Sequence, residues 1–154
     1  MSSIAFVPAT PGDLDLIAGM MRELYEYDRL PFDGTRARRA LGGLIADDRV
    51  GRAFLIKEDA VVAGYVVLTF QYGLEVGGRE TFVDELFIKE PHRGRGLGRR
   101  TFQFLDEFCR QNHILAIHLA VELHNERARR FYESIGFGPP RRYMMSRPVP
   151  PAAR

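Results

Sequence analysis

A glycine- and arginine-rich stretch that directly follows an apolar strand pattern constrains the fold of this chain more than any other feature. The stretch reads Arg93-Gly94-Arg95-Gly96-Leu97-Gly98-Arg99-Arg100, and a helical pattern follows it over residues 97–111. Glycines permit tight turns that bring successive N–H groups to one side, and a helix N-terminus adds partial positive charge. The sequence therefore predicts a strand, a pyrophosphate-binding loop and a helix in that order.

The glycine spacing disfavours the two common nucleotide loops. The pattern G-x-G-x-x-G requires a glycine at position 99, which is Arg99, and a Walker A loop requires a Lys-Ser or Lys-Thr pair that the stretch lacks. Nicotinamide cofactors and nucleoside triphosphates are therefore weak candidates for the ligand.

Residues 93–98 fit R-x-x-G-x-G and resemble the acetyl-coenzyme A loop of the GNAT superfamily of N-acetyltransferases. A second pattern of that family, an Asn followed seven residues later by a Tyr and then by Gly-Phe, occurs at Asn125, Tyr132 and Gly136-Phe137. The two motifs, in this order and separated by an apolar strand, cover roughly residues 82–137. The resemblance implies an enzyme that transfers an acetyl group from acetyl-CoA to a primary amine.

Hydrophobic periodicity predicts an α/β (α+β) fold. Strands are expected over residues 4–7, 52–57, 61–72, 82–88, 114–121 and 141–147, and helices from residue 11 to about 28, and over 36–45, 97–111 and 126–135. The segment 114–121 is almost continuously apolar, which predicts burial on both faces and a parallel partner at 82–88. The resemblance implies a GNAT-like mixed, mostly antiparallel sheet flanked by helices, in which this parallel pair splays apart to admit the pantetheine arm.

The length and composition bound the organisation of the chain. A chain of 154 residues with 45% hydrophobic content suits one domain, and we expect a single acetyltransferase domain over 1–147 and a flexible, proline-rich tail over 148–154. The sequence has neither an apolar run of about 18 residues nor a secretion signal. A soluble cytoplasmic protein without a membrane partner is therefore expected. The single Cys109 and four histidines without ligand spacing predict no metal site.

Charge is distributed unevenly along the chain. Residues 91–154 carry twelve basic and five acidic groups, a net of +7, whereas residues 1–33 carry two and six, a net of −4. A basic half suits the phosphates of coenzyme A, and an acidic segment suits a cationic acceptor. Nucleic-acid binding is the competing explanation for the basic half, but the modest overall charge of +2 and the lack of an aromatic-basic repeat argue against it.

The resemblance assigns the cofactor to three sets of groups. The loop that begins at Arg93, with the backbone N–H groups of Gly94, Arg95, Gly96, Leu97, Gly98 and Arg99, would bind the pyrophosphate. The main chain of Leu86, Phe87 and Ile88 would pair with pantetheine. Asn125 would cap a helix and contact the pantetheine arm.

Tyr132 occupies the position where the family places the general acid that protonates the departing thiolate. A phenol with a pKa of ~10 carries its proton at neutral pH. The competing interpretation is a core aromatic, because Tyr132 shares a helical face with Ala128, Phe131 and Ile135.

Asp84 and Glu85 are the candidate bases that accept a proton from the amine, which has a pKa of ~10 and is protonated at pH 7. Adjacent strand residues face opposite sides, so only one of them is expected to line the cleft directly, and the sequence leaves open which. The resemblance to diamine N-acetyltransferases favours Asp84.

The acceptor is expected near Tyr25, Glu26, Tyr27 and Asp28, at the end of the first predicted helix. The resemblance to the diamine and thialysine acetyltransferase branch supports this placement, because carboxylates and aromatic faces attract a cationic amine. An ordinary acidic helix end is the alternative.

The resulting hypothesis is an acetyl-CoA-dependent N-acetyltransferase that acts on a small cationic amine, polyamine or lysine-like, by direct attack in a ternary complex. One alternative is an enzyme that acetylates a protein N-terminus or lysine. Another is a non-catalytic acyl-CoA-binding regulatory module. A homodimer is expected on analogy with the family.

Overall fold

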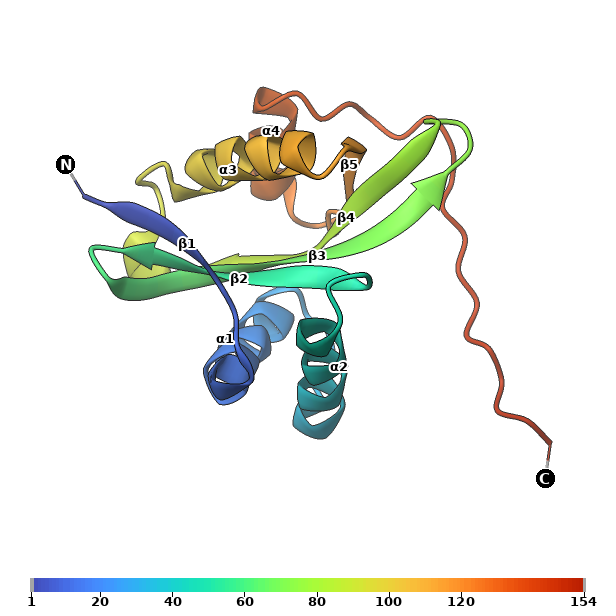
Figure 1. Ribbon diagram of the computed structural model, residues 1–154, viewed down its shortest axis with the longest axis horizontal. Coiled ribbons are helices and arrows are strands. Elements are labelled where there is room, and N and C mark those ends of the chain that lie inside the picture. The colour runs from blue at the N-terminus through green and yellow to red at the C-terminus, as the bar shows by residue number, and fades with distance from the viewer. Residues whose placement is uncertain (1, 154) are drawn as a thin grey trace. The chain divides into compact units, whose positions relative to one another are not determined.

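The computed structural model describes residues 2–153, which form two compact units (Figure 1). The first extends to Glu122, and the second begins at Leu123. The first unit contains β1 (Ile4–Pro8), a 3-10 turn η1 (Pro11–Asp13), α1 (Leu14–Tyr27), α2 (Gly34–Ala46), β2 (Gly51–Glu58), β3 (Val61–Gly73), β4 (Gly78–Ile88), a 3-10 turn η2 (Glu90–His92), α3 (Leu97–Gln111) and β5 (Ile114–Leu119). The second contains α4 (Glu126–Ser134).

The first unit is built on a five-stranded sheet in the order β1-β2-β3-β4-β5. The first four strands pair antiparallel, and β4 pairs with β5 in parallel. Helix α3 makes the crossover that a parallel pair requires. The predicted mixed, mostly antiparallel sheet and its parallel pair are confirmed.

The helices of the first unit cover both faces of the sheet (Figure 1). Helices α1 and α2 lie on one face, and α3 lies on the other. On the first face the core is formed by alternate strand residues and by the apolar stripes of α1 and α2, including Ile17, Met21, Leu41, Leu55, Tyr65, Val67 and Phe87. On the opposite face Phe6 stacks on Phe104 with ring centroids 4.4 Å apart, and Phe54 packs edge-on against the same ring.

Two details of the predicted sheet are wrong. Residues 141–147 form no strand, and the described part of the second unit contains no other strand with which they could pair. The predicted burial of residues 114–121 on both faces also fails, since β5 ends at Leu119 and Leu115 is 58% exposed. Within the first unit β5 is one of the two edge strands, and α3 packs against it.

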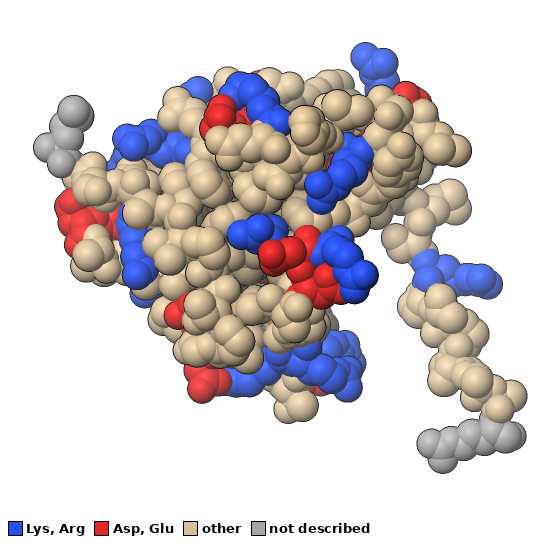
Figure 2. All heavy atoms as spheres, viewed as in Figure 1, with Lys and Arg blue, Asp and Glu red and all other residues tan. Residues whose placement is uncertain are grey.

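Charged side chains of both signs are interspersed on the molecular face that Figure 2 presents. Exposed ion pairs of the protein include Arg38 with Asp15 at 2.8 Å and Arg49 with Asp47 at 2.9 Å. Among residues 2–153, no helix has the length and apolar character needed to cross a membrane.

Candidate active site

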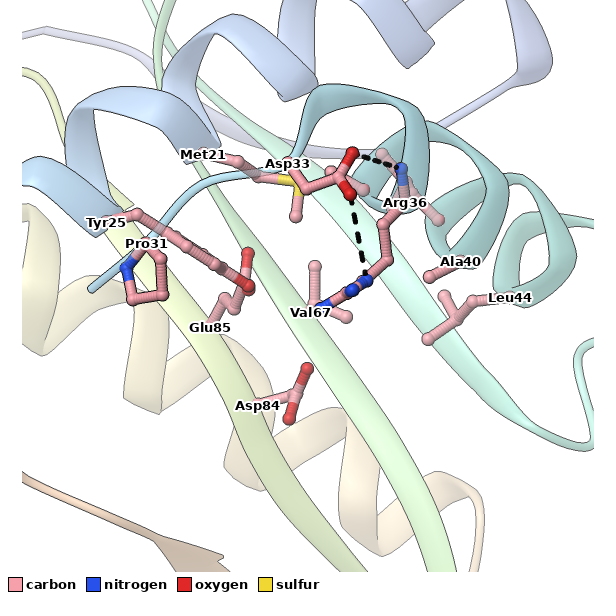
Figure 3. A pocket seen from close by; sticks show the side chains of 12 residues that line it. Met21, Tyr25, Pro31, Asp33, Arg36, Ala40, Leu44, Val67, Asp84 and Glu85 are labelled. Carbon is pink, nitrogen blue, oxygen red and sulfur yellow. Dashed lines mark hydrogen bonds and ion pairs between the residues drawn. The ribbon is translucent and has the colours of Figure 1, made fainter. Parts of the chain in front are cut away.

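A cavity of about 290 Å³ lies between α1, α2 and the middle of β3 and β4 (Figure 3). Its apolar wall includes Met21, Leu41, Leu44 and Val67. Its polar side chains are Tyr25, Asp33, Arg36, Asp84 and Glu85. We refer to this cavity as the acceptor pocket.

Asp84 and Glu85 both line the acceptor pocket, although they are adjacent in one strand. The cause is a β-bulge in β4. Val67 of β3 pairs with Glu85 and Leu68 pairs with Val83, so Asp84 is an extra residue without a partner in the ladder. The prediction that only one of the two carboxylates could line the cleft was therefore wrong, because it assumed the regular alternation of a strand without a bulge.

Glu85 is held by two tyrosine hydroxyls. Tyr25 of α1 donates to its Oε2 at 2.6 Å, and Tyr65 of β3 donates to its Oε1 at 2.8 Å. Burial raises the pKa of Glu85 above its usual value, while these two hydrogen bonds oppose the rise. Burial, together with the nearby Glu85 carboxylate, raises the pKa of both tyrosines. Both hydroxyls therefore stay protonated and continue to donate.

Asp84 differs from Glu85 in having both oxygens available. It makes no hydrogen bond or ion pair with any residue between positions 2 and 153, and its side chain keeps access to solvent. The protein atoms around it still displace part of its hydration and raise its pKa. Asp84 is thus a free carboxylate with a raised pKa inside a pocket.

Of the four residues predicted near the acceptor, only Tyr25 lines the pocket. Tyr27 is half exposed, and the guanidinium of Arg93 lies 5.6 Å from its ring centroid. Asp28 lies close enough to Glu85 to raise the pKa of that carboxyl by its negative charge. Glu26 is exposed and lies outside the pocket lining.

Two polar pocket residues, Asp33 and Arg36, were not predicted from the sequence. Asp33 is the N-cap of α2, and its Oδ1 accepts a hydrogen bond from the backbone N–H of Arg36 at 3.0 Å. The spacing of an Asp three residues before an Arg at a helix start was the available signal. It identifies a cap, but it does not reveal that the first turn of α2 faces the pocket.

The glycine-rich loop has the backbone geometry that a pyrophosphate site requires. Gly94 and Gly96 have φ angles of 70° and 82°, in the left-handed region that favours glycine, and a Cβ on either would point into open space. Gly96 caps α3 and offers no side chain to its first turn. The N–H groups of Leu97, Gly98 and Arg99 lack intrahelical acceptors and are free to bind an anion. The loop therefore fits the pyrophosphate of coenzyme A.

Two arginines of the loop bind it to strands of the sheet. Arg93 Nε donates to the carbonyl of Ile88 at 2.7 Å. Arg95 Nη2 lies 3.0 Å from Glu58 Oε1, and His92 Nδ1 lies 2.6 Å from Glu58 Oε2. Glu58 is only 4% exposed, and its pKa is lowered, chiefly by the hydrogen bond with His92. This buried carboxylate at the end of β2 thus anchors the first half of the loop, on both sides of Gly94.

The ladder between the two parallel strands ends beside the carboxylates. The ladder between β4 and β5 ends at Val83 and Leu119, whereas β4 continues to pair with β3 as far as Ile88. Within the first unit, the other edge of β4 is unpaired from Asp84 to Ile88. The predicted pantetheine contacts, Leu86, Phe87 and Ile88, lie on this free edge.

The remaining predicted residues belong to the second unit. The side chain of Asn125 caps α4, since its Oδ1 accepts from the N–H of Ala128 at 3.1 Å. The ring of Tyr132 packs against Phe131 and Phe137, with centroids 5.3 and 5.8 Å away. Gly136 follows the helix with a φ of 105°, as predicted for its C′ position.

Comparisons with known proteins agree with these features. The profile of the acetyltransferase (GNAT) family matches residues 18–137. An uncharacterized N-acetyltransferase of Lactobacillus delbrueckii subsp. lactis is 27% identical over 150 residues, covering 88% of this chain and 85% of the relative. The thialysine N-epsilon-acetyltransferase of Bos taurus is 25% identical over 145 residues, with the same coverage. A crystal structure of an integron cassette protein from the mobile metagenome of Cole Harbour Salt Marsh superposes with a TM-score of 0.82 at 27% identity, covering 96% of this chain and 91% of that one.

Proposed function

Because the chain belongs to the GNAT family of acetyltransferases, it transfers an acetyl group from acetyl-CoA to an amine, and we propose that its acceptor is a small cationic primary amine. The class includes polyamines and lysine-like molecules. The observation that carries the proposal is the acceptor pocket, in which Asp84 and Glu85 stand side by side on the bulge of β4. A relative named a thialysine N-epsilon-acetyltransferase supports the lysine-like part of that class.

Asp84 is the proposed base. The acceptor arrives as an ammonium, and its nitrogen becomes nucleophilic only after losing a proton. Asp84 is free to accept that proton, directly or through a water, and its raised pKa brings it nearer to the amine in basicity. Glu85, whose oxygens are occupied by Tyr25 and Tyr65, supplies negative charge that attracts the ammonium.

The cofactor contacts follow from the loop and the free strand edge. The N–H groups of residues 94–99 would hold the pyrophosphate, and the main chain of residues 86–88 would pair with the pantetheine arm, with Asn125 as a further contact. The thioester of acetyl-CoA supplies the acetyl group. With both substrates bound together, proximity accounts for a large share of the rate, and Tyr132 would give its proton to the departing sulfur.

The size of the pocket suits a small acceptor. A volume of about 290 Å³ has room for about ten water molecules. A lysine side chain of a protein would also fit this space, so the assay below includes peptides beside the small amines.

A thiol-release assay with acetyl-CoA tests the proposal. The amine panel spans polyamines, lysine analogues, aminoglycosides, amino acids and peptides, and acetyl-CoA binding is measured in parallel. Turnover confined to small amines is the expected result. Turnover on peptides alone would replace this acceptor class with a protein acceptor, and tight binding without turnover on any amine would favour a regulatory module.

A further inference from the structure

We infer that Arg36 forms a carboxylate-binding subsite in the acceptor pocket, so that the preferred acceptor carries a primary amine at one end and a carboxylate at the other. The inference rests on the proposed function, because it concerns the same pocket. It also divides the proposed acceptor class, since lysine-like amino acids carry such a carboxylate and polyamines do not.

Arg36 lines the pocket with a side chain that remains open to solvent. It lies in the first turn of α2, and its side chain extends toward the space in front of Asp84 and Glu85 (Figure 3). The hydrogen bond to the Asp33 cap comes from the backbone N–H of Arg36, so the cap does not depend on the Arg36 side chain.

The guanidinium has hydrogen-bonding capacity that the protein does not use. Its only ion-pair contact with a residue between positions 2 and 153 runs from Nε to Asp33 Oδ2 at 4.0 Å, the limit for such a pair. Its two terminal nitrogens donate to none of those residues, and the side chain is 76% exposed. A planar guanidinium with free parallel donors matches the two oxygens of a carboxylate.

The charges in the pocket occupy separate walls. Asp84 and Glu85 come from the sheet, whereas Arg36 comes from the first turn of α2 beside its N-cap Asp33, and Arg36 forms no ion pair with Asp84 or Glu85. An acceptor with ammonium groups at both ends would place one of them beside a guanidinium, which is unfavourable. A lysine-like amino acid carries a carboxylate beside its α-ammonium, and this carboxylate can pair with the guanidinium, which the corresponding diamine cannot do.

The surface between these polar groups is apolar. Met21, Leu41, Leu44 and Val67 contribute aliphatic side chains to the pocket wall. Such a wall accommodates the methylene chain that joins the amine to the carboxylate in an amino acid such as lysine.

Pairs of acceptors that differ only by the carboxylate test the inference. We would measure kcat/KM for L-lysine against 1,5-diaminopentane and for L-ornithine against 1,4-diaminobutane, with wild-type protein, Arg36→Gln, Arg36→Lys and Arg39→Gln. Arg39 is an exposed arginine of the same helix outside the pocket lining, and it serves as the matched control.

The wild type should prefer the amino acid of each pair. Arg36→Gln should lower kcat/KM for the amino acids by about tenfold to a hundredfold, the value of a charged hydrogen-bonded contact, and should leave the diamines unchanged or improved. Arg36→Lys should retain part of the preference, and Arg39→Gln all of it. Thermal unfolding and acetyl-CoA affinity should be the same in all four proteins.

Two results would overturn the inference while leaving the proposed function intact: a wild-type preference for the diamines, or an equal loss on both members of each pair in Arg36→Gln. If the protein bound acetyl-CoA but turned over no member of either pair, the small-amine proposal would fail together with the inference.

Discussion

The hydroxyl of Tyr25 on α1 donates a 2.6 Å hydrogen bond to the carboxylate of Glu85 on β4, across 60 positions of sequence. This bond joins the helix layer to the strand that carries the proposed base. Tyr65, which is fully buried, donates to the other Glu85 oxygen from β3. Three elements therefore fix the position of one carboxylate, and Asp84 beside it remains free.

Replacing Tyr25 with Phe should weaken both the fold and the site. One Glu85 oxygen would lose its donor, and the free energy of unfolding should fall by about 1 kcal/mol. The pKa of Glu85 should rise further, because the lost hydrogen bond lowers it in the wild type. Urea denaturation measures the loss of stability. The effect on the site is measured as kcat/KM for the acceptor, which should fall. Tyr27→Phe is the control, since Tyr27 lies outside the pocket lining; equal effects of the two substitutions would contradict the role of the Tyr25 hydroxyl.

Asp84→Asn should reduce kcat by about 10²-fold or more, the usual contribution of a general base, with little change in the KM for acetyl-CoA. Glu85→Gln should raise the KM for the acceptor more than it lowers kcat, since Glu85 is proposed to attract the ammonium. Each substitution replaces a carboxylate with an amide of nearly the same size. Because the two residues are adjacent, each variant serves as the control for the other. If Glu85→Gln lowered kcat more than Asp84→Asn did, Glu85 would be the base and Asp84 would be the group that attracts the ammonium.

The same base predicts the pH dependence of activity. A general base works only when deprotonated, so kcat/KM should fall as the pH decreases through the pKa of Asp84. Because that pKa is raised, the acidic limb should lie above the ordinary aspartate value of about 3.9. A pH–rate profile of Asp84→Asn should lack this limb, and its persistence would assign the limb to another group.

The fold and the cofactor loop were largely predictable from the sequence, because their signals are local. The helix expected over residues 97–111 is α3, and the glycines at 94 and 96 adopt the positive φ angles that a tight loop needs. Asn125 caps α4 as expected. Each of these features is determined by residues within a few positions of one another.

The acceptor pocket was less predictable, because it depends on pairing between distant segments. The bulge that turns Asp84 toward the same side as Glu85 is set by how β4 aligns with β3, and no pattern within residues 82–88 reveals it. Arg36 likewise lines the pocket only because α2 packs against α1 and β2, which places its first turn across the pocket from Asp84 and Glu85. Residues 141–147 had the composition of a strand, but a strand also needs a partner edge.

Glu58→Gln should loosen the cofactor loop without disturbing the acceptor pocket. The wild-type carboxylate holds His92 and Arg95, which flank the turn at Gly94, and neutralising it removes the ion pair with Arg95 and weakens the hydrogen bond with His92. We expect the KM for acetyl-CoA to rise roughly tenfold, as for the loss of one charged contact, with kcat nearly unchanged. Glu90→Gln is the control, because Glu90 is exposed and belongs to the same turn region. A fall in kcat at unchanged KM would show that Glu58 does not act through the cofactor loop.

Tyr132→Phe tests the proposed general acid with minimal disturbance of the second unit. The contacts of the Tyr132 ring with Phe131 and Phe137 are made by the aromatic carbons, which phenylalanine retains. Removing only the hydroxyl should therefore preserve the packing of the ring, and thermal unfolding of the variant measures any change in stability. If Tyr132 protonates the departing thiolate, kcat should fall by about 10²-fold or more, far more than the KM for acetyl-CoA rises.

Phe131→Leu, on the same helix, is the control. It should reduce stability more than kcat, because it changes the packing of the helix but removes no proton donor. Retention of wild-type kcat in Tyr132→Phe would remove this tyrosine from the mechanism and leave water or another residue as the source of the proton.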